Sequence, residues 1–207
     1  MDISQVARET YDSLADEYET KVDERRKICL ETMPRFAQTI TSGRRVLDIG
    51  CAIGIQMEVL GNYGFTVDGI DISPRMIEYA RKRNPLSNFF CGDFMKMQFA
   101  EKYDGIIASA FIHLYPKIEA EKVVGRMHSL LKPFGVVLIT TTKEKESSEG
   151  FRAKSDYSGE RKRFRKFWTK EELSQMLIEQ RFAALDYYEF TDVWKKLWMN
   201  HVSRKVD

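Results

Sequence analysis

The stretch Val46-Leu47-Asp48-Ile49-Gly50-Cys51-Ala52-Ile53-Gly54 decides the fold of this chain. A buried strand over Arg45 to Ile49 runs into a loop of small residues, and a helix over Ile55 to Leu60 follows and ends at Gly61. Glycine allows a sharp turn and lets a ligand lie against the backbone. Loops at the carboxyl ends of parallel strands form the binding crevice of such sheets. We therefore expect this loop to contact a ligand.

Short apolar runs alternate with segments of helical period along the middle of the chain. The expected strands are Arg45 to Ile49, Phe65 to Ile70, Asn88 to Cys91, Tyr103 to Ala108 and Gly135 to Thr141. Ser73 and Pro74 mark the start of one intervening helix. Another helix is expected over Pro116 to Leu131, with Ile118 on its inward face. This alternation predicts βαβ units and therefore a parallel sheet.

The two ends of the chain extend this core. Two helices are expected before the first strand, one over Val6 to Val22 and one that runs to about Ile40. Near the other end, Thr169 is the expected cap of a further helix. The segments Phe182 to Phe190 and Lys196 to Arg204 then predict an antiparallel strand pair at one edge of the sheet.

The composition is that of an ordinary soluble globular protein, with 43% hydrophobic and 31% charged residues in a chain of 207. The 33 Lys and Arg residues against 31 Asp and Glu give a formal net charge of +2. This balance argues against a strongly basic nucleic-acid binder. Because the sequence shows neither an apolar run of about 18 residues nor a signal-peptide pattern, we expect one cytoplasmic domain without a membrane partner.

The cysteine and histidine pattern does not indicate a metal site. The chain has Cys29, Cys51 and Cys91, and His113, His128 and His201. The cysteines are odd in number and include no C-x-x-C pair, and the histidines do not stand at metal-ligand spacing. We therefore expect neither a metal nor a disulfide framework.

The glycine pattern argues against two common phosphate sites. A dinucleotide fold requires G-x-G-x-x-G, whereas the spacing here is Gly50, Ala52, Gly54 without the third glycine. No lysine follows the loop, so it is not a P-loop. Asp48 stands inside the motif, where a carboxylate repels a pyrophosphate and suits an ammonium or sulfonium group.

Two further carboxylates follow the next two strands. Asp71 ends the second strand, where a carboxylate can accept two hydrogen bonds from a ribose diol. Asp93 follows the third strand and is placed to accept a proton from an exocyclic amine. Together with Asp48, they describe a site for a neutral or cationic nucleoside.

With these motifs the sequence resembles the class I S-adenosylmethionine-dependent methyltransferases, and the resemblance extends from Tyr11 to about Arg204. The matching pieces are Tyr11-Asp12-Ser13-Leu14-Ala15-Asp16-Glu17-Tyr18, Val46 to Gly54, Asp71-Ile72-Ser73-Pro74-Arg75-Met76, Gly92-Asp93, Tyr103-Asp104-Gly105-Ile106 and Leu130-Leu131-Lys132-Pro133-Phe134-Gly135. The resemblance implies a Rossmann-like α/β fold with helices on both faces of a seven-stranded, mostly parallel sheet of order 3-2-1-4-5-7-6, the last strand antiparallel. The implied activity is EC 2.1.1.-, with S-adenosyl-L-methionine as methyl donor and S-adenosyl-L-homocysteine as product.

The resemblance also implies roles for individual residues. Gly50 to Gly54 are expected to pack against the methionine part of the cofactor, Asp71 to bind the ribose, and Asp93 with Phe94 to bracket the adenine. The full set of expected cofactor-binding residues is Tyr11, Tyr18, Asp48, Gly50, Cys51, Ala52, Gly54, Asp71, Ile72, Met76, Gly92, Asp93, Phe94 and Ser109. Asp48 has a second interpretation, as an acceptor for loop N–H groups. Ala52 departs from the family, which usually has glycine there, and its methyl group leaves less space beside the cofactor.

Two residues are candidates for catalysis. His113 follows the fourth strand, where the family places its acceptor-facing loop, and a histidine with the ordinary pKa of about 6.5 can take a proton from an attacking amine or hydroxyl. The alternative is that a hydrogen bond from His113 holds this loop shut. Tyr18 lies seven residues after Tyr11, on the same helix face. These tyrosines either cover the cofactor or belong to the core.

A basic and aromatic stretch, Arg161-Lys162-Arg163-Phe164-Arg165-Lys166-Phe167-Trp168, lies within the long polar segment Lys143 to Lys166. Segments of this length without regular structure are usually functional or disordered. Three interpretations are open: a solvated strand with its rings turned inward, a basic flap over an acidic small substrate, or a nucleic-acid contact.

The function we expect is methyl transfer to a small-molecule acceptor. The expected parts are an N-terminal helical cap (1–42), a cofactor-binding core (43–142), a substrate flap (143–168) and a C-terminal helix and strand pair (169–207). We expect the N-terminal helix and the Lys143 to Lys166 segment to form the acceptor pocket. The alternatives are an RNA methyltransferase acting on transfer RNA, suggested by the basic stretch and by Trp198 to Lys205, and a regulator that binds the cofactor without turnover. The oligomeric state stays open.

Overall fold

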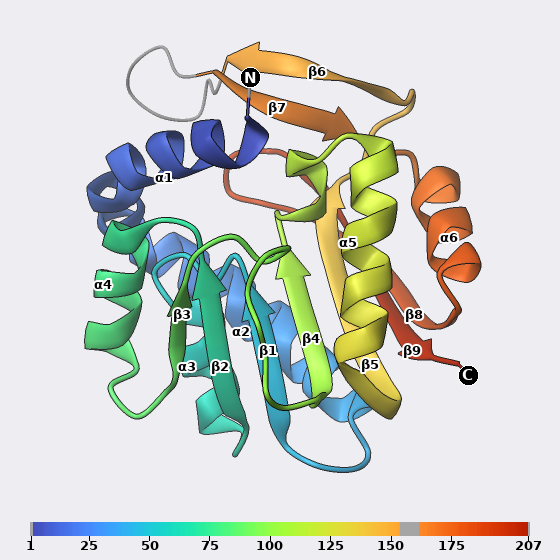
Figure 1. Ribbon diagram of the computed structural model, residues 1–207, viewed down its shortest axis with the longest axis horizontal. Coiled ribbons are helices and arrows are strands. Elements are labelled where there is room, and N and C mark those ends of the chain that lie inside the picture. The colour runs from blue at the N-terminus through green and yellow to red at the C-terminus, as the bar shows by residue number, and fades with distance from the viewer. Residues whose placement is uncertain (1, 154–161, 207) are drawn as a thin grey trace.

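A seven-stranded sheet in the order β3-β2-β1-β4-β5-β9-β8 forms the centre of the protein (Figure 1). The computed structural model describes residues 2–153 and 162–206. The strands are β1 (Arg45–Ile49), β2 (Thr66–Asp71), β3 (Phe89–Cys91), β4 (Tyr103–Ser109), β5 (Leu131–Thr142), β8 (Phe182–Thr191) and β9 (Leu197–Lys205). The first five are parallel, and β9 runs antiparallel to both β5 and β8. Counted within this sheet alone, the order is the expected 3-2-1-4-5-7-6, so the predicted fold is confirmed.

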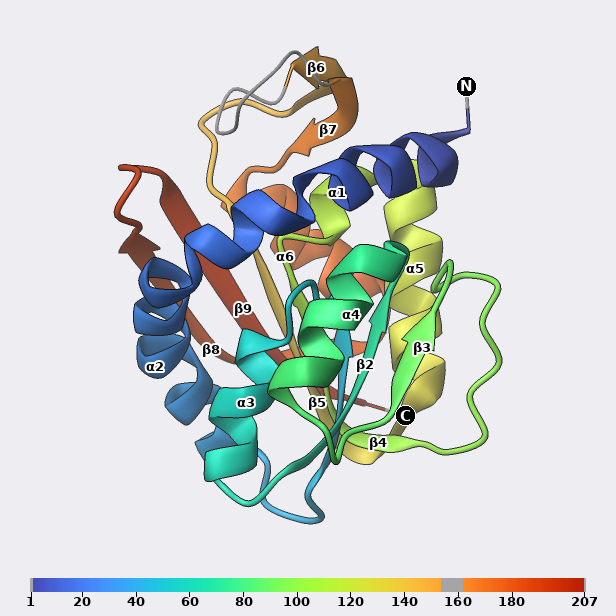
Figure 2. The same ribbon diagram turned by 90° about the vertical axis from the view of Figure 1, so that its left-hand side faces the viewer.

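Helices cover both faces of the sheet, as expected. They are α1 (Ile3–Thr20), α2 (Val22–Thr39), α3 (Ile55–Asn62), α4 (Pro74–Arg83), α5 (Lys117–Leu130) and α6 (Lys170–Glu179), with a short 3-10 helix, η1 (Ile112–Leu114). Helices α2, α3 and α4 pack on one face and α5 and α6 on the other. Helix α1 crosses above the carboxyl ends of the strands (Figure 2).

Alternation along the strands divides the core between the two faces. In β4, Ile107 packs with α2 and α3, whereas Ile106 and Ala108 pack with α5 and α6. All three side chains are fully buried. The sheet therefore has two apolar faces, which is why its strands contain nearly continuous apolar runs.

The predicted helix starts are confirmed at α4 and α6. The Ser73 hydroxyl accepts the N–H of Met76 at 3.1 Å, with Pro74 as the first helical residue. The Thr169 hydroxyl accepts the N–H of Glu172, also at 3.1 Å. Local sequence was sufficient here because a cap depends on residues only three positions apart.

One inward-facing residue was predicted wrongly. Ile118 lies in the first turn of α5 and is 63% exposed. The buried residues of this helix, Ala120, Val123, Val124 and Met127, recur at helical spacing. Ile118 precedes Ala120 by two positions, which places it on the opposite side of the helix.

The long polar segment forms a hairpin outside the main sheet. Strands β6 (Ser148–Ala153) and β7 (Lys162–Phe167) pair antiparallel at the top of Figure 1, next to α1. Part of the basic stretch, up to Arg161, lies outside the described residues. The interpretation as a solvated strand is wrong for Arg165 and Lys166, which are 8% and 2% exposed, whereas the ring of Trp168 is turned inward and buried as that interpretation expected.

Lys166 is buried because α6 supplies a partner for it. Its Nζ donates to both carboxylate oxygens of Glu172, at 2.9 and 3.1 Å, and also binds Ser147. The pairing helps to lower the pKa of Glu172 against the effect of burial. These contacts fasten the base of the hairpin to α6.

No helix among the described residues is long and apolar enough to cross a bilayer.

We predict that Ile106→Ala lowers the free energy of unfolding by about 2–5 kcal/mol, because it leaves a cavity in the central strand β4. Denaturant unfolding measures this change. The control is Leu86→Ala, at a fully exposed position, which is expected to change the value by less than about 0.5 kcal/mol. Equal effects at the two positions would contradict the assignment of Ile106 to the core.

Candidate functional site

A cavity of about 260 Å³ lies at the carboxyl edge of the sheet. One side of it, here called the glycine-loop side, consists of Gly50 to Ile53, Asp71, Ile72, Met76 and Gly92 to Phe94. The other, the β5–β9 side, consists of Thr140, Thr142, Arg163, Arg165, Trp194, Lys196, Trp198 and Asn200. Helix α1 also lines the cavity, through residues that include Ser4, Tyr11 and Tyr18.

Most of the predicted site residues meet at this cavity. Those that line it are Tyr11, Tyr18, Gly50, Cys51, Ala52, Asp71, Ile72, Met76, Gly92, Asp93, Phe94, Ser109 and His113. Among the described residues, the predicted positions that do not line it are Asp48 and Gly54. The topology brings the others together because the carboxyl ends of β1, β2, β3 and β4 share one edge.

The loop after β1 turns through three residues of positive φ. The φ angles are +70° at Gly50, +46° at Ala52 and +80° at Gly54. A Cβ at Gly50 would lie 2.9 Å from Cδ2 of Phe111, a residue of the cavity wall. At Gly54 the neighbour is α4, since a Cβ there would lie 3.0 Å from Cα of Ala80. Gly50 therefore shapes the cavity, whereas Gly54 allows α3 and α4 to pack closely.

Asp71 joins this loop to the loop after β2. Its Oδ2 accepts the N–H of Ala52 and its Oδ1 accepts the N–H of Ser73, both at 2.9 Å. Burial raises the pKa of Asp71 to about 6, although both N–H bonds favour the charged form. Each carboxylate oxygen can accept more than one hydrogen bond, so the group can also bind a hydroxyl in the cavity.

Helix α1 is fastened over the cavity by carboxylate contacts. Asp12 accepts the Ser73 hydroxyl at 2.8 Å and the N–H of Arg75 at 3.1 Å. At the start of the helix, the Ser4 hydroxyl donates to Asp93 at 3.0 Å. Sequence reasoning did not identify Ser4 or Asp12 as part of this arrangement, because both contacts join residues far apart in the chain.

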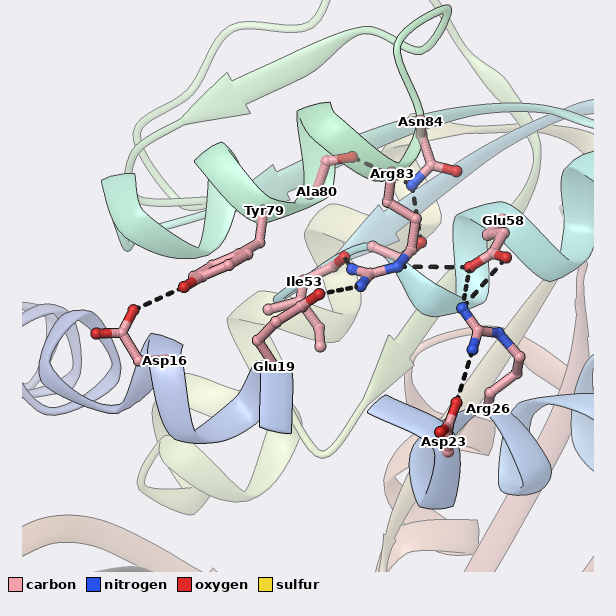
Figure 3. Close-up of polar contacts among 11 residues, drawn as sticks. Asp16, Glu19, Asp23, Arg26, Ile53, Glu58, Tyr79, Ala80, Arg83 and Asn84 are labelled. Carbon is pink, nitrogen blue, oxygen red and sulfur yellow. Dashed lines mark hydrogen bonds and ion pairs between the residues drawn. The ribbon is translucent and has the colours of Figure 1, made fainter. Parts of the chain in front are cut away.

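A second polar network holds the glycine loop from the side of α4 (Figure 3). Arg83 donates to the carbonyl of Ile53 and to Glu19 of α1, the latter at 2.7 Å. The Asn84 amide donates to the carbonyl of Gly54 at 2.9 Å. Glu58 of α3 lies 3.5 Å from the Arg83 guanidinium. The loop is thus tied to α1, α3 and α4 at once.

Asp48 is buried behind the cavity instead of lining it. Its carboxyl is fully buried, and neither oxygen has a hydrogen-bond partner among the described residues. Leu47 and Ile49 face α5 and α6, so alternation directs Asp48 to the face of α2 and α3. Burial, together with the charge of nearby Asp71, raises the pKa of Asp48 to about 8. At neutral pH this carboxyl is therefore mostly protonated.

His113 is 1% exposed and lies in η1 at the cavity wall. Its Nδ1 is 3.0 Å from the Thr141 hydroxyl of β5, and its ring centroid is 6.5 Å from that of Trp198. The Thr141 contact is the one that the loop-holding interpretation requires. A role in proton transfer remains a prediction.

The two predicted tyrosines of α1 both have basic neighbours. The Tyr11 hydroxyl accepts a hydrogen bond of 2.5 Å from Arg163 of β7. Burial raises the pKa of Tyr11 in spite of that neighbour. The Arg25 guanidinium lies 3.8 Å from the centroid of the Tyr18 ring. Both rings line the cavity, as the covering interpretation requires, and a catalytic role for Tyr18 remains a prediction.

The β5–β9 side contains residues that sequence reasoning missed. Trp194 and Lys196 come from the connection before β9, while Trp198 and Asn200 of β9 lie in a stretch singled out only for the transfer-RNA alternative; Arg25 of α2, elsewhere on the wall, was also missed. The alternation of Arg163 and Arg165 in one strand was an available signal for two inward-facing bases. The other residues had none, because their positions depend on how β9 pairs with β5.

Within residues 2–153 and 162–206, no group of three or more His, Cys, Asp or Glu side chains is arranged to hold a metal ion.

Comparison with known proteins assigns the family. A family model described as a methyltransferase domain matches residues 22–185. The chain therefore belongs to the class I S-adenosylmethionine-dependent methyltransferases, the family whose motifs the sequence resembles.

Two curated relatives show how much of the chain is shared. The ubiquinone biosynthesis O-methyltransferase of Actinobacillus pleuropneumoniae serotype 5b is 35% identical over 109 residues, which cover 48% of this chain and 46% of that protein. The malonyl-[acyl-carrier protein] O-methyltransferase of Acetivibrio thermocellus is 30% identical over 161 residues, which cover 73% of this chain and 56% of that protein. The chain thus spans about half the length of such relatives.

Solved structures share the fold at low sequence identity. Magnesium protoporphyrin IX methyltransferase from Synechocystis, with bound S-adenosylmethionine, has a TM-score of 0.76 at 14% identity and covers 100% of this chain and 98% of its own. The Burkholderia thailandensis 1,6-didemethyltoxoflavin-N1-methyltransferase, with bound S-adenosylhomocysteine, has a TM-score of 0.72 at 17% identity. The match covers 97% of this chain and 91% of that chain.

The buried carboxyl of Asp48 makes stability depend on pH. Its pKa is raised from the ordinary 3.8 to about 8, so between these values the folded state keeps a proton that the unfolded state has lost. Asp48 therefore lowers the free energy of unfolding by about 1.4 kcal/mol per pH unit as the pH rises through this window.

We predict that Asp48→Asn, which mimics the protonated carboxyl, removes this dependence. The free energy of unfolding of Asp48→Asn relative to the unmodified protein should increase as the pH rises from about 4 to about 8. Denaturant unfolding across this range measures the difference. Parallel pH profiles for the two proteins would show that Asp48 is ionised in the folded state.

Proposed function

We propose that this protein transfers a methyl group from S-adenosylmethionine to a small-molecule acceptor. The observation that carries the proposal is a cavity with two chemically different sides, the glycine-loop side and the β5–β9 side. A methyltransferase of this family must hold a nucleoside cofactor and an acceptor next to each other. The bound cofactor supplies an electrophilic methyl group on its sulfonium sulfur.

The glycine-loop side fits the cofactor. Asp71 retains acceptor capacity for the ribose hydroxyls beyond the two N–H groups that it binds. Gly50 leaves open the space that a Cβ would occupy, which suits the methionine part. Asp93 and the 3% exposed ring of Phe94 supply a polar and an apolar contact for the adenine. These are roles that we propose for this chain's own residues.

The β5–β9 side is the proposed acceptor pocket. Asn200 is oriented by Thr140, whose hydroxyl donates to its Oδ1 at 2.8 Å. Arg163 and Arg165 reach this side from β7, and residues of α1 also line the cavity. Alignment of an acceptor with the methyl group can contribute roughly 7–11 kcal/mol in favourable systems. The hairpin and α1 provide that alignment and exclude water.

The position of the basic side chains favours a small acceptor over transfer RNA. Arg165 is 8% exposed and lines the cavity, whereas a nucleic-acid site presents its lysines and arginines along an open surface groove. The relatives named above point the same way, since their names specify ubiquinone biosynthesis, a malonyl group on a carrier protein, and a toxoflavin precursor.

Methyl-labelled S-adenosylmethionine tests the proposal when it is added with a cell extract separated into small-molecule, RNA and protein fractions. We predict label in the small-molecule fraction, and much less with Asp71→Ala. The control Asp23→Ala alters a carboxylate whose side chain is 82% exposed and should transfer label normally. Label in RNA would support the transfer-RNA alternative, and label in no fraction would support a binding protein without turnover.

We also predict that Gly50→Ala weakens binding of S-adenosylhomocysteine at least about tenfold, because a Cβ at φ +70° is strained and meets Phe111. Calorimetric titration measures the affinity. Gly61→Ala is the matched control, since a Cβ there has no neighbour within 4 Å, and its affinity should stay within about twofold. Unchanged affinity in Gly50→Ala would remove the loop from the cofactor site.

A further inference from the structure

The two sides of the cavity differ in charge. Among the described residues, five that carry a positive charge line the cavity: Lys21, Arg25, Arg163, Arg165 and Lys196. None of these belongs to the glycine-loop side as defined above. The acidic residues of the described wall are Asp71, Asp93 and Asp192. Asp71 and Asp93 both belong to the glycine-loop side, so the cofactor and the acceptor would meet opposite charges.

Asp192 has a structural task that uses both of its oxygens. Its carboxylate accepts the N–H groups of Trp194 at 2.9 Å and Lys196 at 2.8 Å, and the indole N–H of Trp198 at 2.8 Å. These bonds fold the connection between β8 and β9 and place two tryptophans and a lysine at the cavity. Asp192 therefore builds the wall, and its single carboxylate is outnumbered there by Arg163, Arg165 and Lys196.

Arg165 is the most buried of the cavity arginines that β7 contributes. It is 8% exposed, and its guanidinium donates to the Thr142 hydroxyl of β5 at 2.7 Å. Arg163 lies on the same face of β7, while Phe164 packs against Phe151 with ring centroids 5.7 Å apart. The hairpin thus directs two guanidinium groups toward the cavity. A guanidinium presents its N–H donors in a planar fork that matches the two oxygens of a carboxylate.

Aromatic rings line the same cavity as these cations. Trp198 is stacked on Phe190, with an interplanar angle of 9° and centroids 6.4 Å apart. The rings of Trp194 and Tyr18 both contact Arg25, whose guanidinium carbon lies 5.8 Å and 3.8 Å, respectively, from their centroids. Broad ring faces of this kind favour a flat, apolar ligand body.

From this combination we infer that the methyl acceptor is a planar aromatic carboxylate, held by Arg165 and Arg163 through its carboxylate and by the tryptophans through its ring. The inference rests on the proposed function and specifies its acceptor. The group that takes the methyl would lie on the part of the acceptor nearer the glycine-loop side.

The test measures binding to protein saturated with S-adenosylhomocysteine. The probes are 3,4-dihydroxybenzoate, 4-hydroxycinnamate and indole-3-carboxylate, each compared with its neutral carboxamide by calorimetry and by tryptophan fluorescence. We predict that at least one carboxylate binds about tenfold or more tightly than its amide, as expected for a charge-assisted hydrogen bond. Arg165→Met and Arg163→Met should each reduce that preference, and Arg165→Lys should retain part of it.

The matched control is Arg152→Met, which alters an exposed base of the same hairpin and should leave the preference unchanged. S-adenosylhomocysteine affinity should stay within about twofold in the Arg165 and Arg152 variants, and saturable binding of S-adenosylhomocysteine shows that each variant folds. If the cofactor product binds but no carboxylate is preferred, or if both arginine variants keep the preference, this inference is wrong and the proposed function stands. If the unmodified protein does not bind the cofactor product, both fail.

Discussion

The site depends on one buried carboxylate that joins two strands. Asp71 accepts the N–H groups of Ala52 and Ser73, and so fixes the loop after β1 against the start of α4. The bond to Ala52 matters because this residue has φ of +46°, a conformation that costs a residue with a Cβ about 1 kcal/mol or more. Where the family usually has glycine, this chain therefore relies on Asp71 to hold the loop. The same carboxylate is the proposed ribose contact, so the shape of the loop and the affinity for the cofactor are linked.

The covering elements extend this link across the molecule. Asp12 of α1 binds the Ser73 hydroxyl, and Arg83 of α4 binds both the carbonyl of Ile53 and Glu19 of α1 (Figure 3). On the opposite side, Arg163 of β7 binds Tyr11. Helix α1 is thus attached to both the glycine loop and the hairpin.

The sequence was a reliable guide wherever local pattern decides the structure. The caps at Ser73 and Thr169 and the strand-end position of Asp71 follow from short-range spacing, whereas the order of the sheet was expected from the resemblance to the family. Asp48 was expected to contact the cofactor because it stands inside the glycine motif. Strand alternation instead directs its side chain toward α2 and α3, away from the cavity. Arg25 and Trp194 could not be predicted, because α2 and the β8–β9 connection reach the cavity only through tertiary packing. The inward direction of Arg165 likewise depends on the contact of β7 with Thr142.

Asp71 orders the loop through its two N–H bonds, and we propose that it also holds the cofactor. A crystal structure of the protein with S-adenosylhomocysteine tests it most directly. We predict ribose hydroxyls within about 3 Å of the Asp71 carboxylate, with the bonds to Ala52 and Ser73 intact and the sulfur directed toward the β5–β9 side. A ribose bound elsewhere, or a loop that keeps its shape with Asp71 turned away from both N–H groups, would contradict it.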